Sequence, residues 1–153
     1  MTTTSLSRLA APLCARLHAE AFAAHEVWDE PFFAKLLALP TTRGLLVEQD
    51  DTPAGFIMWQ HGPEWGEILT LAVLPAYRRS GLARRLLQVM EQALLEDGIT
   101  RSMLDVAADN DAAATLYKAA GYHLLSTRAG YYSRGAGQAV DALVMEKSLT
   151  AVA

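Results

Sequence analysis

The chain has 153 residues, 52% of them hydrophobic, and a formal net charge of -4. This length suits one domain with a full hydrophobic core, so we expect a single domain over residues 1–153. Its arginines gather around one turn, which argues against direct nucleic-acid binding. The short polar start lacks an apolar signal core, and no apolar stretch has membrane-spanning length, so we expect a cytoplasmic protein without a membrane partner.

Hydrophobic periodicity, together with proline and glycine positions, predicts the elements in chain order. In the first half we expect a short edge strand at Thr3–Leu9, helices at Ala11–Ala23 and Pro31–Leu39, and hairpin strands at Leu45–Glu48 and Ala54–Gln60. In the second half we expect strands at Trp65–Val73, Ser102–Ala107, Tyr122–Arg128 and Val140–Lys147, helices at Leu82–Leu95 and Asn110–Ala120, and a mobile loop at Gly130–Gly137. This order predicts the α/β class, with a mixed sheet and helices on its faces. The strands at either end of the Leu82–Leu95 helix should be parallel.

The turn Arg78-Arg79-Ser80-Gly81-Leu82-Ala83 joins a strand to the start of a helix. Gly81 has no Cβ, which lets a ligand approach the backbone closely. Helix-terminal N–H groups, the helix dipole and nearby arginines favour a multiply charged anion such as a pyrophosphate. An ordinary strand-to-helix turn is the alternative for this segment taken alone. Neither Gly-x-x-x-x-Gly-Lys-[Ser/Thr] nor a Gly-x-Gly-x-x-Gly after a strand occurs, so nucleotide hydrolysis and dinucleotide redox chemistry are unsupported.

Four separated segments together resemble the GCN5-related N-acetyltransferase (GNAT) superfamily. They are Glu67–Val73, Arg78–Ala83, Leu104–Val106 with Asn110, and Leu116–Tyr122. The tail segments Arg128-Ala-Gly-Tyr131-Tyr132 and Asp141-Ala-Leu-Val-Met145 are similar to those of the bacterial ribosomal-protein-alanine N-acetyltransferases within it. The resemblance implies the GNAT fold, with a mostly antiparallel sheet and one splayed parallel strand pair. It also implies acetyl-CoA as co-substrate, and we expect no metal.

The resemblance also implies roles for individual residues. The backbone of Leu71, Ala72 and Val73 should hold the pantetheine arm and the thioester oxygen, Arg78, Arg79, Ser80, Gly81, Leu82 and Ala83 should hold the phosphates, and Asn110 should contact the arm. Tyr117 matches a general acid near the thioester sulfur, although a tyrosine at this helical spacing could also be core. Trp28, Tyr131 and Tyr132 match substrate-facing residues.

Two carboxylates are candidates for the general base. The ribosomal-protein group tends to have glutamate where this chain has Asp105, which is shorter by one methylene group. Glu67 begins the central strand at the position where histone-acetylating relatives carry their base. Either residue could act through an ordered water molecule, and either could simply be a solvated carboxylate at a strand end.

The resulting hypothesis is an acetyl-CoA-dependent Nα-acetyltransferase acting on a peptide or protein N-terminus, with the N-terminal alanine of a ribosomal protein as one candidate acceptor. One alternative is acetylation of a small amine, such as an antibiotic, a polyamine or an amino acid. Another is a CoA-binding module with weak catalysis. We expect a monomer or a weak dimer.

Overall fold

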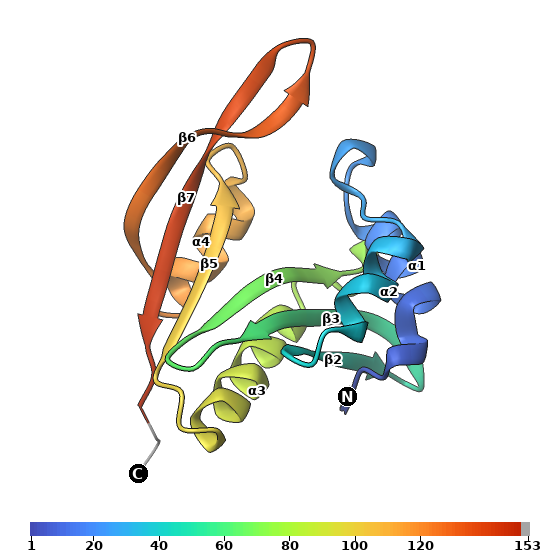
Figure 1. Cartoon of the computed structure of the whole chain (residues 1–153). Coiled ribbons are helices and arrows are strands. Elements are labelled where there is room, and N and C mark those ends of the chain that lie inside the picture. Colours follow the sequence, from blue (N-terminus) through green and yellow to red (C-terminus); the bar gives the residue numbers. More distant parts are fainter. Residues whose placement is uncertain (151–153) are drawn as a thin grey trace.

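Seven strands form one mixed sheet in the order β1-β2-β3-β4-β5-β7-β6 in the computed structural model, which describes residues 1–150 (Figure 1). The strands are β1 (Thr2–Ser5), β2 (Thr42–Gln49), β3 (Thr52–His61), β4 (Gly66–Val73), β5 (Arg101–Ala107), β6 (His123–Gly135) and β7 (Gln138–Ser148). The α-helices are α1 (Ala11–Ala21), α2 (Glu30–Ala38), α3 (Leu82–Glu96) and α4 (Asp111–Ala119), and short 3-10 turns are η1 (Arg8–Ala10), η2 (Ala24–Glu26) and η3 (Pro75–Tyr77).

Every neighbouring strand pair is antiparallel except β4 and β5. Their parallel pairing covers only Gly66–Ile68 opposite Ser102–Leu104, after which the two strands diverge. Leu69 of β4 has no partner in β3, because the register passes from Ile68 directly to Thr70. An extra residue of this kind bends its strand and increases the local twist. The second half of β4 therefore has an open edge toward β5.

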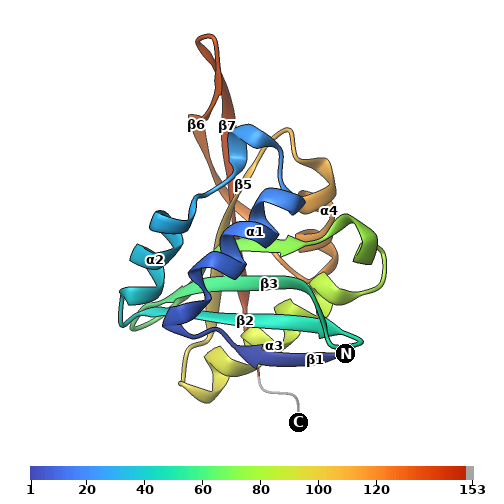
Figure 2. The same ribbon diagram turned by 90° about the vertical axis from the view of Figure 1, so that its right-hand side faces the viewer.

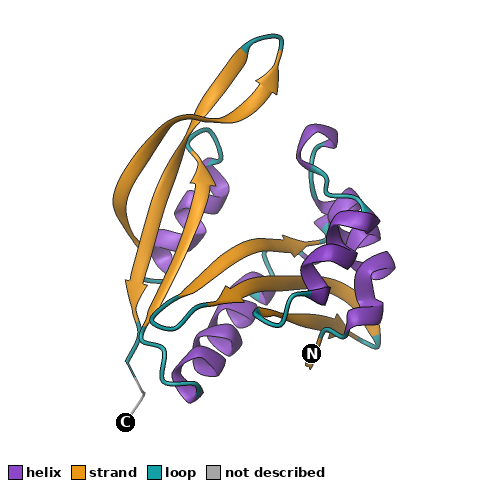
Figure 3. Cartoon of the chain, viewed as in Figure 1, coloured by secondary structure: helices purple, strands orange, loops and turns teal. Residues whose placement is uncertain are grey.

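Helices cover both faces of the sheet and bury separate cores (Figures 1, 2 and 3). Helices α1 and α2 pack on one face of β3 and β4, where Leu17, Phe33 and Phe56 are fully buried. Helix α3 packs on the opposite face through apolar side chains at helical spacing, and its Leu86 and Met90 are fully buried. Helix α4 extends this second core through Tyr117.

The mixed sheet and the parallel β4–β5 pair confirm the predicted fold class. The mobile loop predicted at Gly130–Gly137 is wrong. Strand β6 continues to Gly135 and β7 begins at Gln138, so the segment is the end of a long hairpin. Gly135, Ala136 and Gly137 all have positive φ angles, and these residues make the turn within three positions.

The predicted edge strand at Thr3–Leu9 is too long, because pairing with β2 ends at Ser5 and a 3-10 turn follows. The Ser7 side chain accepts the Leu9 N–H and starts that turn. The other predicted elements occur, with some ends shifted by up to three residues and the strand Tyr122–Arg128 extended to Gly135. Over residues 1–150, no helix is both long and apolar enough to cross a membrane.

Candidate active site

The divergence of β4 and β5 opens a cavity of about 340 Å³, termed the central groove. Residues of α1, η2 and the segment after it, of β4, β5 and β6, and of the start of α4 line this groove. Six residues singled out from the sequence line this groove, namely Trp28, Leu71, Asp105, Asn110, Tyr117 and Tyr132. Chain segments more than 100 residues apart thus meet at one place.

The open edge of β4 directs particular backbone groups toward the gap. The Leu74 N–H donates to the Ala54 carbonyl of β3 at 2.9 Å. Since successive residues of a strand turn their N–H and C=O groups to opposite sides, Leu71 and Val73 turn theirs away from β3. The Ala72 carbonyl points toward β3, since it lies 2.4 Å from the position that a Cβ on Gly55 would take. Leu71 and the N–H of Val73 can therefore pair with an extended ligand, whereas the Val73 carbonyl accepts a hydrogen bond from Arg78 and Ala72 faces β3.

The turn at Arg78–Ala83, termed the anion turn after the ligand predicted for it, follows β4 and η3 and leads into α3. Gly81 is the residue before the helix, with φ 81° and ψ 7°, a left-handed conformation that favours glycine. The first helical hydrogen bond runs from the Arg85 N–H to the Gly81 carbonyl. The N–H groups of Leu82, Ala83 and Arg84 have no acceptor within the helix, as at any helix start. These donors, together with the exposed side chains of Arg79, Arg84 and Arg85, can bind an anion.

Two side chains of this turn are already engaged. The Arg78 guanidinium donates to the Val73 carbonyl at 3.1 Å and to the Ala21 carbonyl of α1 at 2.7 Å. The Ser80 hydroxyl donates to the Tyr77 carbonyl. Arg78 therefore joins the end of α1 to the end of β4, and Ser80 closes the turn on itself.

Helix α4 brings Asn110 and Tyr117 to the groove. The Asn110 side chain caps the helix by accepting the Ala113 N–H at 3.1 Å. The Tyr117 ring packs edge-on against Tyr122, with ring centroids 5.8 Å apart. Burial, and then the neighbouring Tyr132, raise the pKa of the Tyr117 hydroxyl. Tyr117 also lines the central groove.

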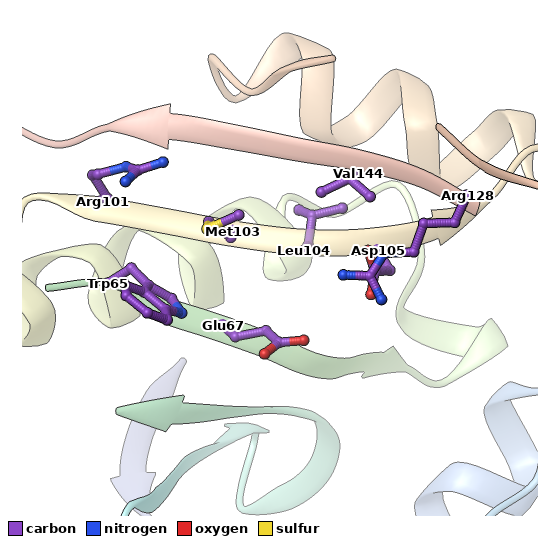
Figure 4. Close-up of a pocket in the computed structure, with 8 residues that line it drawn as sticks. All are labelled: Trp65, Glu67, Arg101, Met103, Leu104, Asp105, Arg128 and Val144. Carbon is purple, nitrogen blue, oxygen red and sulfur yellow. Dashed lines mark ion pairs between the residues drawn. The ribbon is translucent and has the colours of Figure 1, made fainter. Parts of the chain in front are cut away.

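A second cavity of about 380 Å³, termed the side pocket, shares Leu104 and Asp105 with the central groove. Figure 4 shows the carboxylates of Glu67 and Asp105 at this pocket, with Arg128 beside Asp105. The Arg128 Nε lies 4.0 Å from Asp105 Oδ1. Both candidate bases therefore border one space, although Glu67 lines the side pocket alone and Asp105 lines both cavities.

The surroundings of Glu67 shift the pKa of its carboxylate. Burial raises the pKa of Glu67, the negative charge of Asp105 raises it further, and the positive charge of Arg128 opposes the rise. A carboxylate with a raised pKa is a stronger base than a solvated one. The raised pKa of Glu67 is the direction expected of a general base, and which carboxylate acts as the base stays a prediction.

His18 is a groove residue that the sequence analysis missed. It is 2% exposed, its Nε2 lies 3.2 Å from Thr70 Oγ1, and its Nδ1 accepts the Trp28 N–H at 3.2 Å. Phe22 and Trp28 stack on its ring at centroid distances of 4.2 and 5.0 Å. A polar residue four positions after the buried Cys14, on the same helix face, was the available signal.

The residues predicted on the substrate side divide into two groups. Trp28 and Tyr132 line the central groove, while Tyr131 is 51% exposed and does not line it. Burial, and then the charge of Asp105, raise the pKa of Tyr132 to about 12. Arg134 of β6 and Glu26 of η2 also line the groove, which gives its outer part charges of both signs.

The chain is similar in sequence to known acetyltransferases. The model of the acetyltransferase (GNAT) family matches residues 12–122. The chain is 31% identical over 136 residues to N-alpha-acetyltransferase RimI of Mycobacterium tuberculosis, covering 86% of this chain and 84% of that protein. It is 33% identical over 101 residues to [Ribosomal protein bS18]-alanine N-acetyltransferase of Salmonella typhimurium, covering 66% of this chain and 68% of that protein.

Solved structures agree in fold. The ribosomal-protein-S18-alanine N-acetyltransferase from Escherichia coli superimposes with a TM-score of 0.88 at 28% identity, covering 99% of this chain and 96% of the other. Ard1 from Thermoplasma volcanium superimposes with a TM-score of 0.82 at 21% identity, covering 98% of each chain. The second similarity concerns the fold alone.

Proposed function

The chain belongs to the acetyltransferase (GNAT) family and is an N-acetyltransferase, and we propose that it transfers the acetyl group of acetyl-CoA to the α-amine of a protein or peptide N-terminus. The N-terminal alanine of ribosomal protein bS18 is the first acceptor to test, because relatives are named for that activity. The observation that carries the proposal is the central groove, which brings Leu71, Asp105 and Tyr117 together where β4 and β5 part.

The residues present suit acetyl-CoA. The free amides at the start of α3 and the arginines Arg79, Arg84 and Arg85 would hold its phosphates, and the open edge at Leu71 and Val73 would pair with its pantetheine arm. Ser80 and Arg78 would shape this turn through the bonds they already make. When bound, acetyl-CoA supplies the acetyl group as a thioester that an amine can attack directly.

The groove walls suit an extended acceptor. Trp28, which follows η2, and Tyr132 of β6 both line the groove. In Figure 1 the β6–β7 ribbon stands at the left and the segment after α1 at the right. Aromatic side chains at such positions supply large contact areas at low conformational cost. A peptide N-terminus entering between them would bring its amine toward Asp105 and the adjoining side pocket.

The proton chemistry favours an α-amine over a lysine side chain. An α-amine has a pKa of about 8, so neutralising it at pH 7 costs about 1.4 kcal/mol, against about 5 kcal/mol for a lysine at about 10.4. Glu67 or Asp105 would take this proton, directly or through water. The N–H near Val73 would stabilise negative charge that develops on the thioester oxygen. Tyr117 would donate its proton to the departing sulfur, which needs only modest help because thiols have a pKa near 8.5.

An acceptor screen tests this proposal. Purified protein with acetyl-CoA is assayed against short peptides of varied first residue, including the bS18 N-terminal sequence, and against a panel of polyamines, amino acids and aminoglycosides. We expect turnover on peptide α-amines and none on a peptide whose N-terminus is blocked. Turnover on small amines alone would contradict the proposal. Acetyl-CoA binding by calorimetry without turnover on any acceptor would instead favour a CoA-binding module.

A further inference from the structure

The hairpin of β6 and β7 contains a bulge beside the central groove. Arg128 pairs with Ala142, and Tyr132 pairs with Val140. Three residues of β6, 129–131, therefore lie opposite the single residue Asp141 of β7. Two extra residues preserve the alternation of side chains between the two faces of the sheet. They shift the pairing of the later β6 residues along β7 by two positions, or about 7 Å. The bulge thus decides which β6 side chains reach the groove.

Asp141 fastens this bulge from the opposite strand. Its Oδ1 accepts the Gly130 N–H at 2.9 Å. Gly130 has a φ of 58°, so the bulge passes through a left-handed residue at the point where the carboxylate holds it. Hydrogen bonds from a backbone N–H to an ionised carboxylate are among the stronger ones in proteins.

The main chain of Asp141 bonds to the segment that follows β5. Its carbonyl accepts the Ala108 N–H at 2.8 Å, in the connection between β5 and α4. That connection leads to Asn110, which lines the groove. One residue therefore links the bulge of β6 to the segment that carries Asn110.

Two residues that flank the bulge lie near the candidate active site. Arg128 precedes it, and its Nε lies 4.0 Å from Asp105 Oδ1. Tyr132 follows it and lines the central groove. Within the bulge, the Tyr131 ring lies 5.3 Å from the Arg128 guanidinium carbon and 5.1 Å from the Tyr132 ring, edge-on to the latter. A change in the shape of the bulge would therefore be expected to move these three side chains.

We propose that Asp141 is a positioning residue for acetyl transfer, whose carboxylate fixes the β6 bulge so that Tyr132 and Arg128 hold the acceptor against Asp105. The inference rests on the proposed function for the place where the acceptor binds. It concerns a residue that touches neither substrate. Loss of its carboxylate should therefore impair the acceptor side and spare the acetyl-CoA side.

The test compares Asp141→Ala with Asp141→Asn, using as acceptor whichever compound the screen above identifies. Asparagine keeps an oxygen that can accept the Gly130 N–H, and alanine does not. We expect Asp141→Ala to raise the acceptor KM about tenfold, in line with a charged hydrogen bond at an exposed site. Asp141→Asn should stay within about threefold of the parent. The acetyl-CoA Kd, measured by calorimetry, should be unchanged in both variants.

Two further variants distinguish positioning from simple destabilisation. Gly130→Ala strains the left-handed position without a clash, because the added Cβ would meet only Ala139 Cβ at 3.8 Å, and it should raise the acceptor KM like Asp141→Ala. Gln138→Ala, at an exposed site on the same ribbon, should leave both constants unchanged. Amide hydrogen exchange at Gly130 should accelerate in Asp141→Ala whatever the acceptor is.

Three results would overturn the inference: an asparagine variant as impaired as the alanine variant, equal effects on the acceptor KM and the acetyl-CoA Kd, or an unchanged acceptor KM despite faster exchange at Gly130. Failure of the proposed function looks different. In that case the parent protein would turn over only small amines, and the comparison of variants would proceed with one of them.

Discussion

His18 Nε2 lies 3.2 Å from Thr70 Oγ1, which joins the middle of α1 to β4 immediately after its unpaired residue Leu69. The other ring nitrogen accepts the Trp28 N–H, so it carries no proton, and Nε2 is the donor to Thr70. Burial lowers the pKa of His18 to about 4, so the ring is neutral at physiological pH. A neutral histidine thus connects Trp28, where the acceptor is proposed to bind, to β4, the strand proposed to hold the thioester.

Replacing His18 by phenylalanine should therefore lower both stability and acceptor affinity. Phenylalanine keeps the stack with Phe22 and Trp28 but loses both hydrogen bonds, which we expect to cost about 1–3 kcal/mol for the donors and acceptors left unpaired. Urea unfolding at pH 7 measures the free energy of unfolding. The acceptor KM should rise at the same time, while the acetyl-CoA Kd should change little.

The pH dependence of this variant has a definite sign. Because the folded-state pKa of His18 is lowered to about 4 from an unfolded value near 6.5, its contribution to stability is present above pH 6.5. That contribution declines as the pH falls from 6.5 toward 4, since the unfolded chain then takes up a proton that the folded chain does not. The stability difference between the parent and His18→Phe should narrow between pH 7 and pH 5. A constant difference would show that His18 is not buried neutral.

Local sequence patterns predicted the elements that long periodicities or strong breakers define. The apolar stripe of α3 and the glycine before it were sufficient to place the start of this helix, and Gly81 has a left-handed φ there. The binding of an anion at this turn stays a prediction. The prediction that β4 and β5 diverge came from the resemblance to a family. No local pattern in residues 66–73 distinguishes a strand that is half unpaired from one that is fully paired.

The features that the sequence did not reveal depend on tertiary contacts. Gly130 looked like part of a loop because glycine next to aromatic residues is typical of loops, whereas it occupies a bulge held by Asp141, a residue eleven positions later. His18 looked like one residue of an amphipathic helix, and its role depends on Thr70 and Trp28, which folding alone brings near it. Contacts of this kind leave no periodic signal along the chain.

Gly81→Ala should weaken acetyl-CoA binding without unfolding the protein. Nothing lies within 4 Å of a Cβ added at Gly81, so the substitution meets no clash, but its φ of 81° costs an alanine about 1–2 kcal/mol. Calorimetry should show a raised acetyl-CoA Kd, and Gly81→Val should raise it further because the larger side chain obstructs the helix amides.

Gly98→Ala is the matched control for this prediction. Gly98 follows the other end of α3 with a φ of 76° and equally open surroundings, so its substitution imposes a similar backbone strain. We expect a comparable drop in melting temperature and an unchanged acetyl-CoA Kd. Equal Kd values for the Gly81 and Gly98 variants would remove the anion turn from the proposed binding site.

Tyr117→Phe should lower kcat with little change in the acetyl-CoA Kd. The substitution removes only the hydroxyl proton proposed for the departing sulfur, and the ring can keep its packing against Tyr122. Tyr122→Phe provides the comparison, because that hydroxyl lies 2.7 Å from the buried Ser102 Oγ and donates to the half-buried Glu91 at 3.0 Å. We expect Tyr122→Phe to reduce stability and to leave kcat near that of the parent. An unchanged kcat in Tyr117→Phe would make Tyr117 a core residue only.

The general base is the last prediction, and the charges around Glu67 give it a sign. Glu67→Gln should reduce turnover below about pH 7, with activity recovering as the pH rises through the amine pKa of about 8, because an amine that is already neutral needs no base. If Glu67 is the base, the pH at which activity falls on the acid side reports its raised pKa.

The pH at which activity falls on the acid side, termed the acid limb of the pH profile, should shift in opposite directions in two neighbouring variants. Asp105→Asn removes a negative charge that raises the pKa of Glu67, so the limb should shift to lower pH. Arg128→Gln removes a positive charge that opposes the rise, so the limb should shift to higher pH. Profiles of kcat/KM between pH 5 and pH 9 measure both shifts. If Asp105 is the base instead, Asp105→Asn should lose activity below pH 7 as Glu67→Gln was expected to, and Glu67→Gln should retain it. Profiles that overlay the parent in both single variants and in the double variant would exclude both carboxylates, and solvent would then have to accept the amine proton.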